Sequence, residues 1–192
     1  MKGKRVVIVH GYTASPKDNW FPWLKEELGS LGYDVSIPMM PEPNHPNPNE
    51  WQQKLADENI ILDKDTILVG HSLGCITLLR FLPEQACEDI TIGGYILVAG
   101  FNSEQKTLPE LNSHIYNNLN YSKLIKISDK RVSLISSNDW IVSPDSSKKL
   151  ASQLQTQIVI EEDAGHFLDK EGYIKLPVML DIFKYMLNEH KL

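Results

Sequence analysis

A serine flanked by glycines is the first feature of the sequence that could do chemistry. Residues 70–74 read Gly-His-Ser-Leu-Gly, which places Ser72 at the centre of a G-x-S-x-G pattern. In this pattern the serine occupies a sharp turn between a strand and a helix, so that its hydroxyl is exposed at the end of a sheet. The apolar run 67–69 predicts that strand, and the largely apolar run 76–79 predicts that helix. We therefore predict that Ser72 is a nucleophile.

A serine nucleophile needs a general base, and the base needs an acidic residue that orients it. With this pattern the three residues follow one another in the order serine, acid, histidine, on loops after strands. Asp139 follows the expected strand 132–136, and His166 follows the expected strand 158–160. Parallel strands end along one edge of a sheet, so both side chains should lie near the serine. We predict a catalytic triad of Ser72, Asp139 and His166.

The other acids and histidines fit these roles less well. Asp163 lies only three residues before His166 on the same loop, and Asp145 falls in the first turn of a helix, where it favours the helix dipole. His10 and His71 are at the right edge but precede the acid, so we expect structural hydrogen bonds from them. The remaining histidines lie in polar segments and are expected at the surface: His45, His114 and His190.

Acyl transfer also requires backbone N–H donors for the oxyanion. We expect one from Leu73 in the elbow and one from Tyr12 on the loop after the first strand. Phe101 and Trp140 follow strand ends and are candidate apolar walls of a substrate pocket. The proline-rich segment 38–48 can be a rigid connector or a further wall of the pocket, and the two interpretations are compatible.

Strand-like and helix-like segments alternate along the chain. This alternation predicts one α/β domain over residues 1–192, a three-layer αβα sandwich around a mostly parallel six-stranded sheet. The expected strands are 5–9, 33–37, 67–69, 95–98, 132–136 and 158–160. The expected helices are 20–31, 50–62, the helix after the elbow, 144–154 and 177–187, with short candidates at 108–111 and 122–127. Because the segment 102–130 is short, we expect little or no cap over the site.

Composition excludes several classes of partner. The net charge is −6 and no Lys/Arg cluster occurs, so neither nucleic acid nor a membrane surface is an expected partner. The two cysteines, Cys75 and Cys87, form no disulfide framework and fit a reducing cytoplasm, with Cys75 in the core. No metal-binding or nucleotide-binding motif is present, so we expect no metal and no cofactor. We expect a cytoplasmic protein, with a monomer favoured.

On these motifs the chain resembles a small α/β-hydrolase, and more narrowly the YdeN-like serine hydrolases, a group that includes the retinoblastoma-binding protein nine. The resemblance rests on His10-Gly11, the turn 70–74, Asp139 with its following Trp-Ile-Val-Ser-Pro, and Gly165-His166, and it runs over nearly the whole chain. It implies a reduced α/β-hydrolase fold and the same triad. Retinoblastoma binding is not implied, because the stretch 73–77 departs from L-x-C-x-E at its last position.

These observations favour a serine hydrolase that cleaves small carboxylic ester or amide bonds through an acyl-enzyme on Ser72. Its substrate would be a small molecule. Two alternatives stay open. One is a catalytically silent protein-interaction module that keeps the fold, and the other is an acyltransferase or thioesterase that uses the same triad.

Overall fold

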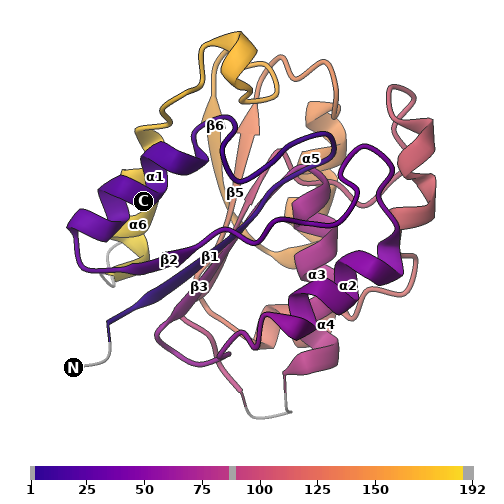
Figure 1. Cartoon of the computed structure of the whole chain (residues 1–192). Helices are drawn as coiled ribbons and strands as arrows, with labels where there is room; N and C mark the ends of the chain where they lie inside the picture. The colour runs from indigo at the N-terminus through magenta and orange to yellow at the C-terminus, as the bar shows by residue number, and fades with distance from the viewer. Residues whose placement is uncertain (1–2, 87–89, 188–192) are drawn as a thin grey trace.

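A six-stranded parallel sheet runs through the middle of the molecule (Figure 1). The computed structural model describes residues 3–86 and 90–187, and within them the strand order is β2-β1-β3-β4-β5-β6, with every neighbouring pair parallel. The strands are β1 Arg5–Val9, β2 Asp34–Ser36, β3 Thr66–His71, β4 Gly94–Val98, β5 Arg131–Ser136 and β6 Gln157–Glu161. The predicted α/β class is confirmed, and the sheet is entirely rather than mostly parallel.

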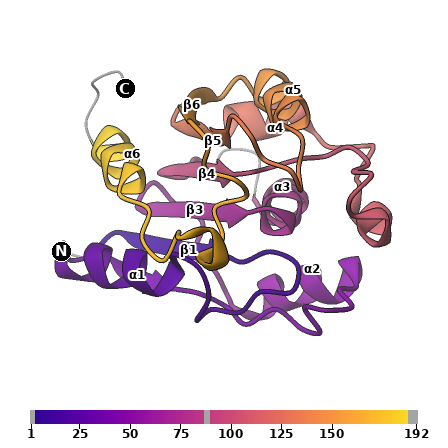
Figure 2. The same ribbon diagram turned by 90° about the horizontal axis from the view of Figure 1, so that it is seen from above.

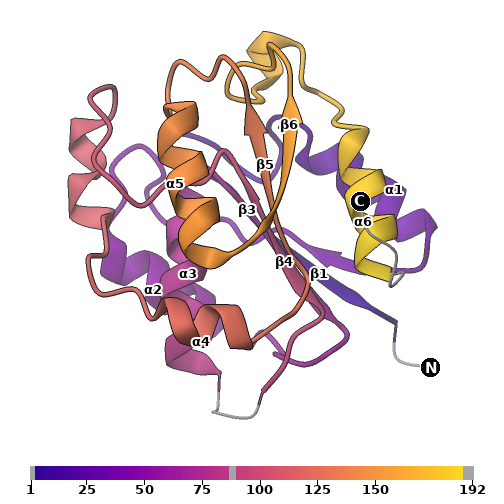
Figure 3. The same cartoon turned by 180° about the vertical axis from the view of Figure 1, so that it is seen from behind.

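Helices cover both faces of this sheet, which gives the three predicted layers (Figures 2 and 3). One face carries α1 Phe21–Ser30 and α6 Val178–Leu187. The other face carries α2 Pro48–Asp57, α3 Leu73–Gln85, α4 Tyr121–Lys126 and α5 Pro144–Leu154. Two short 3₁₀ helices complete the described elements, η1 Pro109–His114 and η2 Asp169–Glu171. None of the described helices is both long and apolar enough to cross a lipid bilayer.

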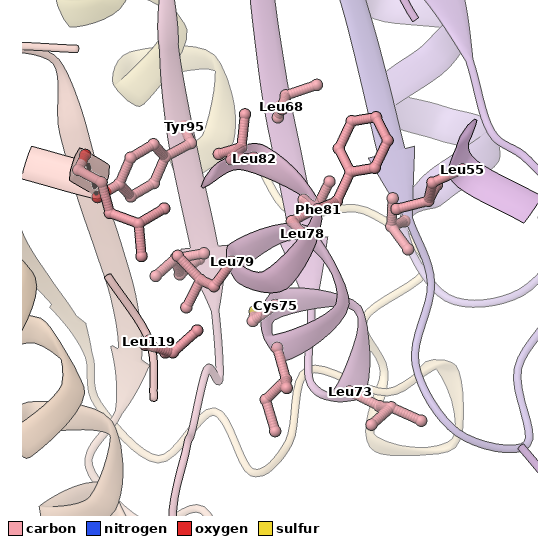
Figure 4. Packing of buried hydrophobic residues seen from close by; sticks show 14 of the residues in the cluster. Leu55, Leu68, Leu73, Cys75, Leu78, Leu79, Phe81, Leu82, Tyr95 and Leu119 are labelled. Atoms are coloured by element: carbon pink, nitrogen blue, oxygen red, sulfur yellow. Dashed lines mark hydrogen bonds between the residues drawn. The ribbon is translucent and has the colours of Figure 1, made fainter. Parts of the chain in front are cut away.

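The helix behind the elbow, α3, is the centre of the larger hydrophobic cluster. Figure 4 shows Leu78, Leu79 and Leu82 of this helix beside Leu68 of β3 and Tyr95 of β4. Cys75 is buried in the same cluster, as expected, and burial raises the pKa of its thiol, so the thiol stays protonated. Since nearly every turn of α3 is buried, its N-terminus is held firmly against the sheet.

The start of α2 differs from the prediction. The sequence predicts that this helix begins at residue 50, yet α2 begins at Pro48. Proline is compatible with the first helical turn, because the N–H that it lacks has no partner there. The Asn47 side chain caps this turn by accepting hydrogen bonds from the Asn49 and Glu50 N–H groups, at 2.9 and 3.3 Å.

The segment between β4 and β5 packs against the helices α2 and α3. In η1, His114 is buried and donates from Nε2 to the Pro46 carbonyl at 3.0 Å. Its ring also packs edge-on against Trp51 of α2, with 6.0 Å between the centroids. The prediction of a surface position for His114 was therefore wrong. His45 is exposed, as predicted, whereas His190 and Cys87 lie outside the described residues.

All six strands end along one edge of the sheet, at the top of Figure 1. The loops that leave β1, β3, β5 and β6 at this edge carry Tyr12, Ser72, Asp139 and His166 respectively. The parallel topology thus brings together four segments that are far apart in the sequence.

Candidate active site

Ser72 occupies a strained turn between β3 and α3. Its backbone has φ 54° and ψ −119°, a positive φ that residues with a Cβ atom rarely adopt. The glycines on either side permit this turn. A Cβ at Gly74 would lie 2.1 Å from the Val9 carbonyl oxygen, and one at Gly70 would lie 2.8 Å from the Cys75 Cα. The sharp strand-to-helix turn that the motif predicts is present, and it requires both glycines.

Gly74→Ala is expected to lower the free energy of unfolding by about 3 kcal/mol or more, since the new methyl group meets the β1 backbone and α3 must move away from the sheet. Urea denaturation measures this change. Gly29→Ala is the matched control because its Cβ would meet nothing within 4 Å near the exposed end of α1. We expect it to be neutral or stabilising by about 0.5–1 kcal/mol. Equal stability of the two variants would contradict the close packing.

His166 and Asp139 form a buried hydrogen-bonded pair. His166 Nδ1–H donates to Asp139 Oδ2 at 2.7 Å, and the two side chains are 4% and 2% exposed. The other carboxylate oxygen of Asp139 accepts from the backbone N–H groups of Ile141 and Val142, both at 2.9 Å. Asp139 is therefore held on both oxygens. Because its carboxylate accepts from Nδ1, the neutral His166 ring presents an unprotonated Nε2.

Ser72 and His166 line one cavity of about 260 Å³ at the edge of the sheet. Within residues 3–86 and 90–187, neither the Ser72 hydroxyl nor His166 Nε2 makes a hydrogen bond to the chain. Both groups are thus available to a bound molecule. The hydrogen bond between a catalytic serine and its histidine is often long in the free enzyme and tightens only when substrate is bound. The rival acids lie elsewhere, because Asp163 and Asp145 are exposed and neither is bonded to His166.

The two predicted oxyanion donors border Ser72. Leu73 is the first residue of α3, so its N–H has no carbonyl within the helix to bond. Tyr12 lines the cavity, and the preceding Gly11 packs directly on the serine, where an added Cβ would lie 3.1 Å from the Ser72 Cβ. In the part of the chain that the structure describes, the Tyr12 N–H also lacks an internal acceptor.

The predicted apolar walls are not part of this cavity. Phe101 is 1% exposed and packs in the hydrophobic cluster around α3. Trp140 is 59% exposed, and its indole N–H donates to Glu171 at 2.7 Å. The cavity is instead lined largely by polar side chains of two distant loops, among them Asp18, Asn19, Asp169 and Lys170.

Sequence reasoning missed these polar residues because they lie farther from the ends of β1 and β6 and belong to no motif. A hydrogen bond joins the two loops, because the Asp169 N–H donates to Asn19 Oδ1 at 2.9 Å. Asn19 also has a positive φ of 53°, a conformation that asparagine tolerates better than most residues. This tolerance is the one local signal that marks the turn.

The proline-rich segment supports the Tyr12 loop and is absent from the cavity lining. The Met40 N–H donates to His10 Nε2 at 3.0 Å, and the Thr13 N–H donates to the Pro43 carbonyl at 2.8 Å. The opposite nitrogen, His10 Nδ1, donates to the Gly11 carbonyl at 2.9 Å. Of the two interpretations of this segment, the structure supports the rigid connector, and His10 has the structural role that was predicted.

His71 also has a structural role. Its Nε2–H donates to the His166 carbonyl at 3.0 Å, and its ring packs against Trp20 and Phe21. Burial, helped by the neighbouring His166, lowers the pKa of His71 to about 3. The ring therefore stays neutral at physiological pH and keeps the Nε2 proton that this bond requires.

Acidification should destabilise the fold through its buried histidines. Burial lowers the pKa values of His10, His71 and His114 below the usual 6.5, so the unfolded chain binds more protons than the folded one just below that pH. The contribution of these histidines to stability is then fully present above pH 6.5, and it decreases as the pH falls. Below pH 6.5, protonation of each histidine in the unfolded chain lowers the free energy of unfolding by up to about 1.4 kcal/mol per pH unit. For His71 this decrease continues down to about pH 3.

Urea unfolding at several pH values between 7 and 5 measures this decrease. His114→Gln is expected to reduce the slope, because glutamine cannot take up a proton. The exposed His45→Gln is the control and should leave the slope unchanged. A stability that does not vary over this range would contradict the assignment.

Comparison with known proteins shows the family to which the chain belongs. The family model described as "Serine hydrolase" matches residues 6–185, which is most of the chain. The chain belongs to the serine hydrolase family. It is 37% identical to the YdeN hydrolase of Bacillus subtilis over 179 residues, which covers 93% of this chain and 94% of that protein. It is 24% identical over 154 residues to the rat serine hydrolase RBBP9, covering 79% and 80% of the two chains.

Solved structures of hydrolases share the fold of this serine hydrolase. The crystal structure of the B. subtilis ydeN gene product superposes with a TM-score of 0.89 at 36% identity, covering 96% of this chain and 98% of that one. A monoacylglycerol lipase of Paleococcus ferrophilus shares the fold with a TM-score of 0.67 at 17% identity, covering 84% and 85%. The family resemblance and the fold expected from the sequence are therefore confirmed, and the protein is a hydrolase.

Proposed function

We propose that this serine hydrolase cleaves small carboxylic ester or amide bonds through an acyl-enzyme on Ser72. The buried His166–Asp139 pair carries the proposal, because its histidine lines the same cavity as a serine in a strained turn. A histidine paired in this way is a competent general base for a serine hydroxyl. A protein that only binds partners has no use for this set of three residues.

In the proposed reaction, His166 Nε2 accepts the Ser72 proton while Ser72 Oγ attacks the carbonyl carbon of the substrate. The tetrahedral intermediate collapses when His166 returns that proton to the departing alcohol or amine, which leaves an acyl group on Ser72. Water then repeats the sequence on the acyl-enzyme and releases the carboxylic acid. Asp139 holds the ring orientation and stabilises its positive charge throughout.

The developing oxyanion would be bound by the Leu73 and Tyr12 N–H groups. Both belong to segments that contact Ser72, and one is at the N-terminus of a 13-residue helix whose dipole favours negative charge. These N–H groups need not move during the reaction, because the elbow and the β1 loop are already fixed by their packing.

The cavity supports a small substrate with polar character. Its volume of about 260 Å³ is near the lower end of ligand sites, and polar residues such as Asn19 and Asp169 line it. Phe101 and Trp140, the expected apolar walls, do not border the cavity and so give no support to an apolar acyl group.

Reaction with a fluorophosphonate tests the proposal without requiring the natural substrate. We expect intact mass to show one adduct on the wild type and none on Ser72→Ala or His166→Ala. Ser152→Ala removes an exposed serine of α5 and should keep the adduct. Absence of an adduct on folded wild type would contradict the proposal and favour the interaction module. Adding an alcohol or amine to an ester assay then distinguishes acyl transfer from hydrolysis by the product formed.

A further inference from the structure

His166 lies outside regular secondary structure, and side chains hold its backbone on both sides. The residues before and after it, Gly165 and Phe167, both have a φ of 58°. The His166 N–H donates to Glu171 Oε2 at 2.8 Å, and the His166 carbonyl accepts from His71 Nε2 at 3.0 Å. The orientation of the proposed base therefore depends on two side chains that do not touch its ring nitrogens.

Glu171 also reaches the loop that carries Asp139. The Oε2 atom that binds His166 accepts a second hydrogen bond, from the Leu168 N–H at 3.0 Å. The other oxygen, Oε1, accepts from the Trp140 indole N–H at 2.7 Å. Trp140 directly follows Asp139 in the chain. One carboxylate thus connects the loop of the proposed base with the loop of the acid that orients it.

The turn before His166 is shaped to accept this carboxylate. A Cβ at Gly165 would lie 2.5 Å from Glu171 Oε1, so a residue with a side chain cannot occupy this position without displacing Glu171. The neighbouring Lys170 ammonium lies 5.4 Å from the centre of the Trp140 ring, which adds a cation–π contact on the same bridge. The bridge therefore has several independent contacts around one acidic side chain.

We propose that Glu171 is a positioning residue that keeps His166 paired with Asp139 in the orientation that proton transfer from Ser72 requires. The inference rests on the proposed function, since it concerns the same base and acid. It assigns no chemical step to Glu171. Loss of the carboxylate would free the His166 backbone and let its ring move relative to Ser72, and displacements of about 1 Å in such sites cost on the order of 100-fold in rate.

The rate of fluorophosphonate labelling measures this effect. We expect Glu171→Ala to lower the second-order labelling rate by about 10- to 100-fold, and to lower kcat on a small ester with little change in KM. Glu171→Gln should recover much of the loss, because an amide oxygen can still accept from His166 and Leu168. The matched control is Glu162→Ala, which removes an exposed carboxylate from the same connection between β6 and α6. This variant should be labelled at the wild-type rate.

Trp140→Phe isolates the contact with the Asp139 loop, because it removes the indole donor and keeps an aromatic ring. We expect a smaller loss than for Glu171→Ala. Added to Glu171→Gln, it should lower the rate no further, since the glutamine amide already lacks an acceptor for the indole N–H. Additive losses in the double variant would contradict a shared bridge.

A second measurement separates this inference from the proposed function. The His166 Nδ1 proton, bonded to Asp139, should give a low-field proton resonance in the wild type. We expect that resonance to broaden or vanish in Glu171→Ala while the amide spectrum remains that of a folded protein. An unlabelled wild type would overturn the proposed function alone, because the resonance still reports on the pair. A Glu171→Ala variant that labels within twofold of wild type, or keeps a sharp resonance, would overturn the positioning role. If this variant does not fold, Trp140→Phe decides by the same two readouts, and a labelling rate and a resonance equal to those of the wild type would overturn the positioning role.

Discussion

Replacing Ser72 by alanine is expected to lower kcat on a small ester by about 10⁶-fold, because the reaction loses the atom that forms the acyl-enzyme. The fold should tolerate the change. The Ser72 hydroxyl makes no hydrogen bond within the described chain, and alanine meets the same backbone strain at a φ of 54°. We therefore expect the free energy of unfolding to stay within about 0.5 kcal/mol of wild type.

Hydrolysis of a chromogenic acetate ester, followed together with urea unfolding, measures both quantities on the same protein. Ser152→Ala should keep wild-type turnover and serves as the control for loss of a serine hydroxyl. A Ser72→Ala protein that retains more than about one hundredth of the turnover would show that another group carries the reaction.

Asp139→Asn is expected to lower kcat by about 10⁴-fold with little change in structure. The reason lies in the two backbone N–H groups that donate to Asp139 Oδ1. They orient the asparagine with its oxygen toward Ile141 and Val142, so its NH₂ group faces His166 Nδ1. A donor at that position forces the His166 proton onto Nε2, and this tautomer cannot accept the proton of Ser72.

The same ester assay measures this loss. Asp163→Asn is the matched control, because Asp163 is an exposed acid close to His166 in the sequence. It should keep turnover within about twofold of wild type. A wild-type rate for Asp139→Asn, or a large loss for Asp163→Asn, would move the orienting role to the other acid.

The sequence predicts the fold and the three candidate catalytic residues because the signals that place them are local. Short β-branched runs such as Arg5–Val9 predict strands, and a parallel sheet puts all strand ends on one edge. The order of Ser72, Asp139 and His166 along those ends then limits the choice of partners. The elbow glycines add a steric signal, which the structure bears out at Gly74.

The predictions failed where the direction of a side chain decides the outcome. Phe101 and Trp140 both follow strand ends, but position alone does not show that one enters the core and the other bonds a glutamate. His114 occupies a polar segment, yet it is buried and its ring packs against Trp51 of α2. Nothing in the sequence marks Glu171 as a site residue. A glutamate in a polar loop is common, and its hydrogen bonds to backbone N–H groups follow no sequence pattern.

The support of the Tyr12 loop by the proline-rich segment has a consequence for protein engineering. The His10–Met40 hydrogen bond joins residues 30 positions apart. The Pro43 carbonyl accepts a hydrogen bond from the N–H of Thr13, the residue after Tyr12. Substitutions around Met40 and Pro43 should therefore change the shape of the loop beside Ser72, although these residues do not line the cavity. A mutant library restricted to cavity-lining positions would leave this remote adjustment unexplored, whereas one that includes residues 40–43 samples the geometry of the loop itself.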